Sequence, residues 1–144
     1  AENLTKAVMV KANLQNADLG NAIMTDVDLT NANLRGADLS RANLRMANLT
    51  GADLEDENLT NANLVNAKMI GADLSRSDLR RANLSGADLT DAKLIETKLT
   101  YANLRGTNLE GADLTGANFS AAVYDSSTKF PEGFVSRCSL SLKY

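Results

Sequence analysis

The sequence lacks several residue types on which enzyme sites usually depend. Among its 144 residues there is no His, no Trp, a single Cys and a single Pro. Without His there is no imidazole base and no imidazole metal ligand, and the lone Cys138 can form neither an internal disulfide nor the usual thiol–base pair. We therefore expect no catalytic residue, no metal site and no cofactor.

Aromatic residues, long apolar runs and excess charge are also scarce. Aromatic residues make up 4% of the chain, which favours a core built from one small repeated unit. No apolar run approaches the roughly 20 residues needed to cross a membrane, so we expect no membrane insertion. The net charge of −3 is too small to indicate a nucleic-acid-binding surface, and direct nucleic-acid binding is not expected.

What the sequence does contain is a repeat of five residues. Every fifth residue from Leu4 to Phe119 is apolar, and 20 of these 24 residues are Leu. The residue two places before each of them is Ala in 18 cases, and the residue one place before is Asn or Asp in 19. The unit is therefore A-[N/D]-L-x-x, and a match of this length does not arise by chance.

Each unit is predicted to be a short extended segment followed by a turn. A period of five fits neither a helix nor a plain strand. Ala and Leu are two residues apart, so both point inward from an extended segment, and the Asn or Asp points outward, where it can bond the backbone locally. The last residue of the unit is often Gly or Asn, as at Gly36 and Asn61. Both adopt the positive φ that the third residue of a type II turn requires.

This pattern resembles the pentapeptide-repeat family over residues 2 to about 124. The resemblance implies an all-β fold, a right-handed quadrilateral β-helix with four units per coil and about six coils. We expect residues 1–124 to form this solenoid and residues 125–144, which contain the single Pro, to form a C-terminal cap. The ending at residues 124–134 is similar to that of many cyanobacterial and chloroplast members, which favours a photosynthetic source.

The register of the repeat also predicts a core and its two ends. Representative core residues are Leu34, Leu54, Leu74, Leu94, Leu114 and Phe119. The candidates for covering the last Leu layer are Phe130, Phe134, Val135, Leu140, Leu142 and Tyr144. The N-terminal end shows no comparable cap. Either Glu2, at an inward Ala position, blunts this edge, or a capping segment has been removed.

One inward column contains polar residues where Ala is the rule. Glu57, Ser77 and Thr97 are spaced 20 residues apart and should stack on one another. Because an unpaired buried carboxylate is costly, we expect Glu57 to turn outward or to hydrogen-bond with Ser77. The alternative is that residue 57 lies at a corner wet enough to tolerate a charge.

Two parts of the outward surface differ from the rest. An acidic face collects Asp53, Glu55, Asp56, Asp73, Glu96 and Asp113 together with Arg35, Arg76 and Lys93. Six outward apolar residues fall on two adjacent faces: Val8, Val10, Ile23, Met46, Val65 and Ile70. Contiguous exposed apolar surface marks contact sites, so these six are the predicted partner surface. The alternative is the ordinary tolerance of scattered apolar residues.

These observations predict a non-catalytic structural or interaction protein that presents rigid faces to a protein partner, which the sequence does not name. The alternative is DNA mimicry, known for family members that protect DNA gyrase, although the small charge and the lack of inserted loops depart from those members. A metal-binding or enzymatic role comes third. We expect a monomer or an end-to-end or side-to-side dimer. Its location would be the cytoplasm or, if a signal peptide was removed, the periplasm or thylakoid lumen.

Overall fold

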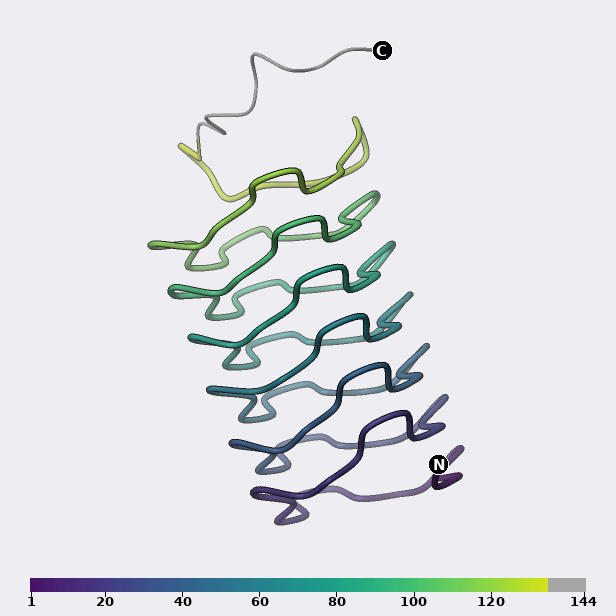
Figure 1. Cartoon of the computed structure of the whole chain (residues 1–144). Coiled ribbons are helices and arrows are strands. Elements are labelled where there is room, and N and C mark those ends of the chain that lie inside the picture. The colour runs from purple at the N-terminus through teal and green to yellow at the C-terminus, as the bar shows by residue number, and fades with distance from the viewer. Residues whose placement is uncertain (135–144) are drawn as a thin grey trace.

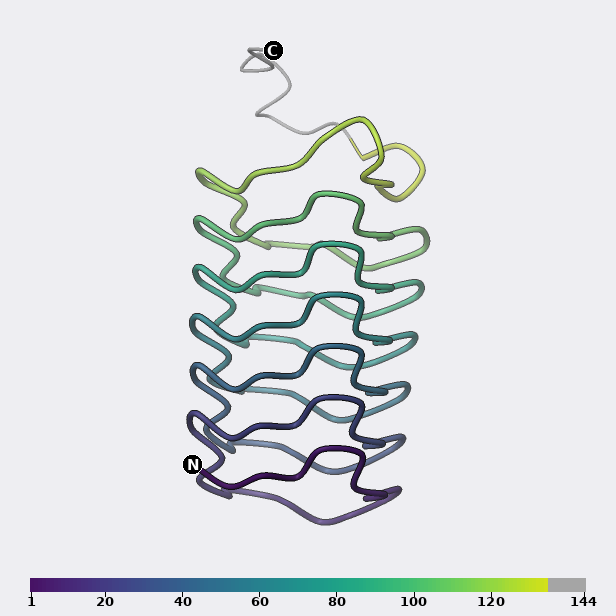
Figure 2. The same cartoon turned by 90° about the vertical axis from the view of Figure 1, so that its right-hand side faces the viewer.

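The structure, a computed structural model that describes residues 1–134, is a stack of coils along one axis (Figures 1 and 2). Its secondary structure consists of turns and single-residue parallel β-bridges, which join residues 20 positions apart from Asn3↔Ile23 to Asn103↔Val123. Because 20 residues are four repeat units, each coil has four sides. Between residues 1 and 134 there is neither a helix nor a strand longer than one bridge residue. The predicted β-solenoid is confirmed.

Every corner of the solenoid is a turn of the predicted kind. In the first unit the Ala7 N–H donates to the Leu4 carbonyl oxygen at 3.0 Å, and Lys6 has a φ of 58°. The corresponding third turn residue has a positive φ in every unit from Lys6 to Ala121. Only seven of these residues are Gly and five are Asn. At the other corners the stacked coils therefore hold less tolerant residue types in the left-handed region.

In residues 42–46, a unit with an outward Asn, all five backbone N–H groups find acceptors. The Ala N–H donates to the Leu carbonyl of the preceding unit, the Asn N–H to the preceding coil, and the N–H groups of Leu and of the last residue to the following coil, at 2.8–3.0 Å. The fifth N–H, that of Arg45, donates to Oδ1 of Asn43 at 3.3 Å. Since a buried unpaired N–H is costly, this complete pairing stabilises a stack whose sides are each only one bridge long.

The outward Asn or Asp makes this side-chain bond in all 19 units that contain one. The predicted local bonding is confirmed, and it explains the preference for these two residue types. Their short side chains place an acceptor oxygen within reach of the N–H two residues later. Val, Ile and Lys, which replace them in the other five units, have no acceptor to offer.

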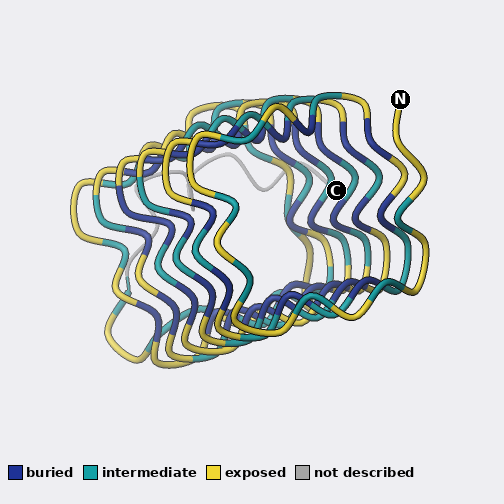
Figure 3. Cartoon of the chain, turned by 90° about the horizontal axis from the view of Figure 1, so that it is seen from below, coloured by how far each residue is buried: buried dark blue, intermediate teal, exposed yellow. Residues whose placement is uncertain are grey.

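Leu and Ala form the buried core along the length of the stack, and Figure 3 shows the buried segments lining up from coil to coil. The predicted core residues have the following burial: Leu34, Leu54, Leu74 and Leu94 have no exposed surface, and Leu114 and Phe119 are half-buried. At the other end Leu4 and Met9 are half-buried and Glu2 is exposed. The core is thus continuous, and it becomes more exposed toward both ends of the described chain.

The ladder continues past Val123 with a change of register. Asn108 pairs with Lys129, which lies 21 residues later. Beyond this bridge the rings of Phe130 and Phe134 have their centres 6.4 and 5.7 Å from that of Phe119. They stack on one another at 5.0 Å. The other residues expected in the cap lie outside the described residues: Val135, Leu140, Leu142 and Tyr144.

Replacing an outward Asn by Ala should destabilise the solenoid by removing one of these acceptors. In the parent protein the Thr50 N–H donates to Oδ1 of Asn48 at 3.2 Å. Asn48→Ala removes this acceptor. We expect a loss of about 1 kcal/mol in the free energy of unfolding, measured by denaturant titration. Asn48→Asp keeps the acceptor and serves as the control. Equal stability of Asn48→Ala and the parent protein would show that water replaces the bond at no cost.

Candidate interaction surface

The described residues offer little that resembles a catalytic or metal centre. Between residues 1 and 134 no three His, Cys, Asp or Glu side chains are placed so that they could hold a metal ion. The same stretch contains no helix of the length and hydropathy that a membrane crossing requires. Cys138 lies outside it.

Glu57 lies inside the stack, contrary to both sequence-based expectations. Its exposed fraction is 1%, so it neither turns outward nor occupies a wet corner. Ser77 does stack in the same column, but its hydroxyl donates to the Leu74 carbonyl at 2.6 Å, and that of Thr97 donates to the same oxygen at 2.8 Å. Among the described residues neither carboxyl oxygen of Glu57 has a hydrogen-bond partner. The expectation of a Glu57–Ser77 bond is wrong because the hydroxyls are satisfied by the backbone.

The ladder widens beside Glu57. The Asn58 N–H reaches the Ala37 carbonyl at 3.5 Å, and the Gly36 N–H reaches that of Glu55 at 3.4 Å. Comparable bonds elsewhere, such as Asp53 to Ala32, measure 2.9 Å. A Glu side chain in a column sized for Ala accounts for this local separation of two coils.

Burial raises the pKa of Glu57 to about 9, and the nearby backbone N–H groups of Ala37 and Asn58, which form no hydrogen bond to the carboxyl, offset this only in part. The negative charges of Asp38 and Asp53 act in the same direction as burial. Glu57 is therefore a neutral carboxylic acid at pH 7. Since the folded chain binds this proton more tightly than the unfolded chain, the stability that it contributes is complete below about pH 4.5 and is lost as the pH rises through about 9.

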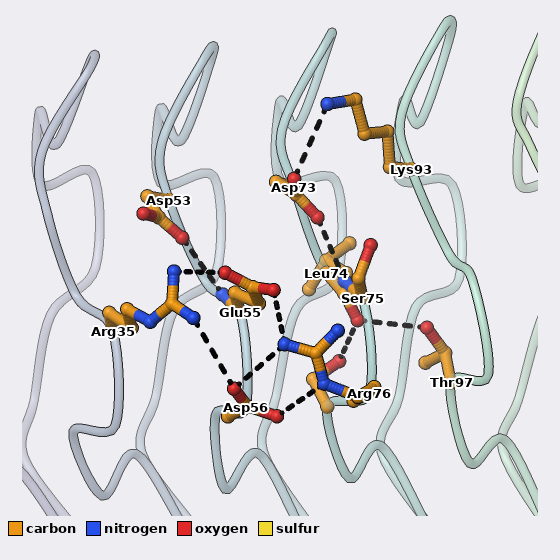
Figure 4. A network of polar contacts seen from close by, with 11 residues as sticks. Arg35, Asp53, Glu55, Asp56, Asp73, Leu74, Ser75, Arg76, Lys93 and Thr97 are labelled. Atoms are coloured by element: carbon orange, nitrogen blue, oxygen red, sulfur yellow. Dashed lines mark hydrogen bonds and ion pairs between the residues drawn. The ribbon is translucent and has the colours of Figure 1, made fainter.

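On the acidic face, arginines from neighbouring coils neutralise the acids (Figure 4). Glu55 forms ion pairs with Arg35 of the preceding coil and with Arg76 of the following coil. Arg76 Nε also lies 2.9 Å from Oδ1 of Asp56. The hydrogen bond from Arg76 holds the pKa of Asp56 below its usual range. The acidic face thus carries a connected network in which Arg35 and Arg76 balance the charges of Glu55 and Asp56.

The six predicted apolar residues are dispersed over several coils. Five of them are exposed, with exposed fractions from 79% at Val8 to 38% at Ile70. The sixth, Val65, is half-buried. Met46 and Val65 are adjacent on consecutive coils, where the Met46 N–H donates to the Val65 carbonyl at 3.0 Å. Val10 and Ile70 occupy the same column but lie three coils apart. Met46 and Val65, with Ile23 one coil away from Met46, form the tightest group.

One side of the rod, here called the asparagine face, comprises residues 41–46, 61–66, 81–86 and 101–106. Asn43, Asn63, Asn83 and Asn103 form a column along its centre, joined by parallel bridges. Its two borders carry Arg41, Arg45, Arg81 and Arg105, and all four side chains are exposed. The four segments contain no Asp and no Glu. Met46 and Val65 belong to the same face.

A hollow of about 360 Å³ lies at one border of this face, lined by Thr60, Asn61, Arg80, Arg81, Thr100 and Tyr101. The guanidinium carbon of Arg81 is 5.9 Å from the centre of the Tyr101 ring. Tyr101 is 61% exposed and has a φ of 61°, a conformation that a bulky residue rarely adopts. Arg80 turns away to Asp78, with its Nη2 2.6 Å from Oδ2.

The sequence analysis placed Met46 and Val65 on the predicted partner surface but missed the arginines and Tyr101 of the same face. The signal was present in the sequence: the four segments, spaced 20 residues apart, contain four Arg, one Tyr and no acid. Counting charges over whole sides, corners included, would have found it.

The repeat pattern matches the sequence model of the family described as pentapeptide repeats, in eight copies that cover residues 2–26, 25–56, 58–94 and 92–123. The chain belongs to the pentapeptide-repeat family. A comparison with curated proteins gives no match. In this pentapeptide-repeat protein the matched segments include the whole asparagine face and the network around Arg76.

Solved structures of other pentapeptide-repeat proteins are similar to it. Rfr23 from the cyanobacterium Cyanothece is 39% identical over 67% of this chain and 66% of its own, with a TM-score of 0.66. HetL from Nostoc, a protein involved in the regulation of heterocyst differentiation, is 29% identical over 93% of this chain and 78% of its own, with a TM-score of 0.54. A protein of the Arabidopsis thaliana thylakoid lumen is 32% identical over 65% and 66%, with a TM-score of 0.64. The match thus spans slightly less than two thirds of the Cyanothece and Arabidopsis chains.

Glu57→Ala should raise the melting temperature, because it restores the Ala pattern and removes an unpaired carboxyl. The gain should grow with pH between about 4.5 and 9, by up to about 1.4 kcal/mol per pH unit, as the parent protein is forced to ionise a buried group. Thermal unfolding at several pH values measures this. Glu96→Ala, at an exposed position, is the control. A gain that does not change with pH would contradict the burial of Glu57.

Proposed function

We propose that this pentapeptide-repeat protein is a non-catalytic interaction module that presents rigid solenoid faces to a protein partner. The observation that carries the proposal is the 20-residue ladder register, which holds outward side chains in fixed columns. A surface ordered before binding loses little conformational entropy when a partner docks. The interior, by contrast, is filled by Leu and Ala.

The group formed by Ile23, Met46 and Val65 supports a particular place for this contact. Met46 and Ile23 are 54% and 41% exposed, and Val65 touches Met46 through the backbone. Apolar side chains are rare on the outward positions of this chain, where Asn, Asp, Thr and Arg predominate. A partner that covers these three residues would gain from their burial.

The charge pattern favours a protein partner over DNA mimicry. A duplex-like surface needs a dense and unbalanced row of negative charges. On the acidic face the ion pairs of Arg35 and Arg76 balance Glu55 and Asp56 instead. The asparagine face carries arginines and no acids.

We also infer the finer features of the fold from the family and from the contacts at the C-terminal end. The winding is right-handed, with about six coils, and residues 125–144 close the last of them. The packing of Phe130 and Phe134 on Phe119 supports the capping role. A cap of this kind protects an open ladder edge from pairing with other chains.

Changing Ile23, Met46 and Val65 together to Ser should reduce partner capture from an extract of the native organism. Losing three central apolar contacts is expected to weaken binding by at least about tenfold. Changing Val8, Val10 and Ile70 to Ser removes as many apolar side chains elsewhere and is the control. If the first variant keeps its fold by circular dichroism and captures as much partner as the parent protein, this surface is not the contact.

A further inference from the structure

The asparagine face has a charge of opposite sign to that of the whole chain. Its four segments contain four arginines and no acidic residue, whereas the chain carries a net charge of −3. On the opposite side of the rod, two units away along each coil, residues 51–56, 71–76, 91–96 and 111–116 contain seven acidic and two basic residues. Positive and negative charge are therefore separated across the width of the rod.

The arginines of this face are free to bind a partner. Within residues 1–134 none of Arg41, Arg45, Arg81 and Arg105 forms an ion pair, in contrast to Arg35 and Arg76 on the acidic face. Within the four segments no carboxylate competes for them, and the acids Asp26 and Asp125 in the same columns lie one coil beyond the two ends of the face. Arg81 is held over the ring of Tyr101, which orients its guanidinium group beside the hollow.

We propose that the asparagine face binds an acidic segment of a protein partner, an inference that rests on the proposed function and specifies the partner's chemistry. Arginine presents a planar group that binds carboxylates with two parallel hydrogen bonds. Tyr101 supplies exposed aromatic surface next to Arg81, and Tyr and Arg are the residues that most often dominate protein interfaces. The Asn column between the two borders adds no negative charge that would repel the segment.

The same charges favour a protein segment over a nucleic acid. A nucleic acid needs many cations along its backbone, and four arginines spread over four coils are few. At long range a nucleic acid would also be repelled by a chain of net charge −3. A protein segment with a few carboxylates contacts only the near side of the rod, where the charge is positive.

The spacing of the arginines defines a probe. Arg41 and Arg81 share a column two coils apart, about 10 Å at roughly 4.8 Å per coil. A peptide of Glu-Pro-Pro repeats is a stiff polyproline II helix that places a carboxylate about every 9 Å along one side. A fluorescein-labelled peptide of six such repeats can be titrated with the protein by fluorescence anisotropy. The matching Lys-Pro-Pro peptide is the control probe.

Two matched variants separate this face from the overall charge. Arg81→Asn with Arg105→Ser removes two charges from the asparagine face, using residues that occupy the same columns at Asn61 and Ser85. Lys11→Asn with Lys68→Asn removes two charges elsewhere, following Asn31 and Asn48. We expect the first variant to weaken binding of the Glu-Pro-Pro peptide by about fivefold or more, and the second by less than about twofold.

Several outcomes overturn the inference. These are an absence of peptide binding by the parent protein, equal losses in the two variants, or equal binding of the Lys-Pro-Pro peptide. Tighter binding of a single-stranded DNA of equal charge would assign the face to nucleic acid, and self-association lost only in the Arg variant would assign it to a second copy of this chain. If the parent and the Arg variant capture the same native partner equally, the proposed function stands and this inference fails. If the parent captures no partner, the proposed function fails and the titration still decides the inference.

Discussion

Hydrogen bonding between successive coils is the constraint on which the rest of the molecule depends. It joins residues 20 positions apart, and with the turn bonds it leaves one N–H per unit for the outward Asn or Asp. It also holds a positive φ at each corner, even where the residue is Arg81 or Tyr101. Because residue type at a corner is overruled by the ladder, the chain can carry large polar side chains there without losing its register.

The repeat predicted the fold well because each inference depended on a local rule. Five-residue spacing gave the turn in every unit, Ala and Leu gave the interior, and the Asn or Asp gave the local acceptor, as at Asn43. The position of Glu57 could not be predicted in the same way. The sequence shows the residue types of its column. Whether the side chain stays inside or turns outward depends on the free energy of separating two coils compared with that of turning the side chain out.

The asparagine face shows a second limit of prediction. A corner residue borders two sides. Arg45 or Arg105 can therefore be assigned to the face only when the direction of its side chain is known. The contact of Arg81 with Tyr101 joins residues 20 positions apart and requires the ladder register. The acidic face was easier to predict, because its residues lie together in the run Glu55-Asp56 and in columns of Asp.

The separation of charge across the rod gives the molecule an electric dipole perpendicular to its long axis. A charged partner approaching within a Debye length, about 8 Å at physiological ionic strength, would rotate the rod before contact so that one long side leads. Such orientation shortens the search for the bound arrangement and raises the association rate while leaving dissociation largely unchanged. A filled solenoid can thereby select, through its charges alone, which of its four sides a partner meets first.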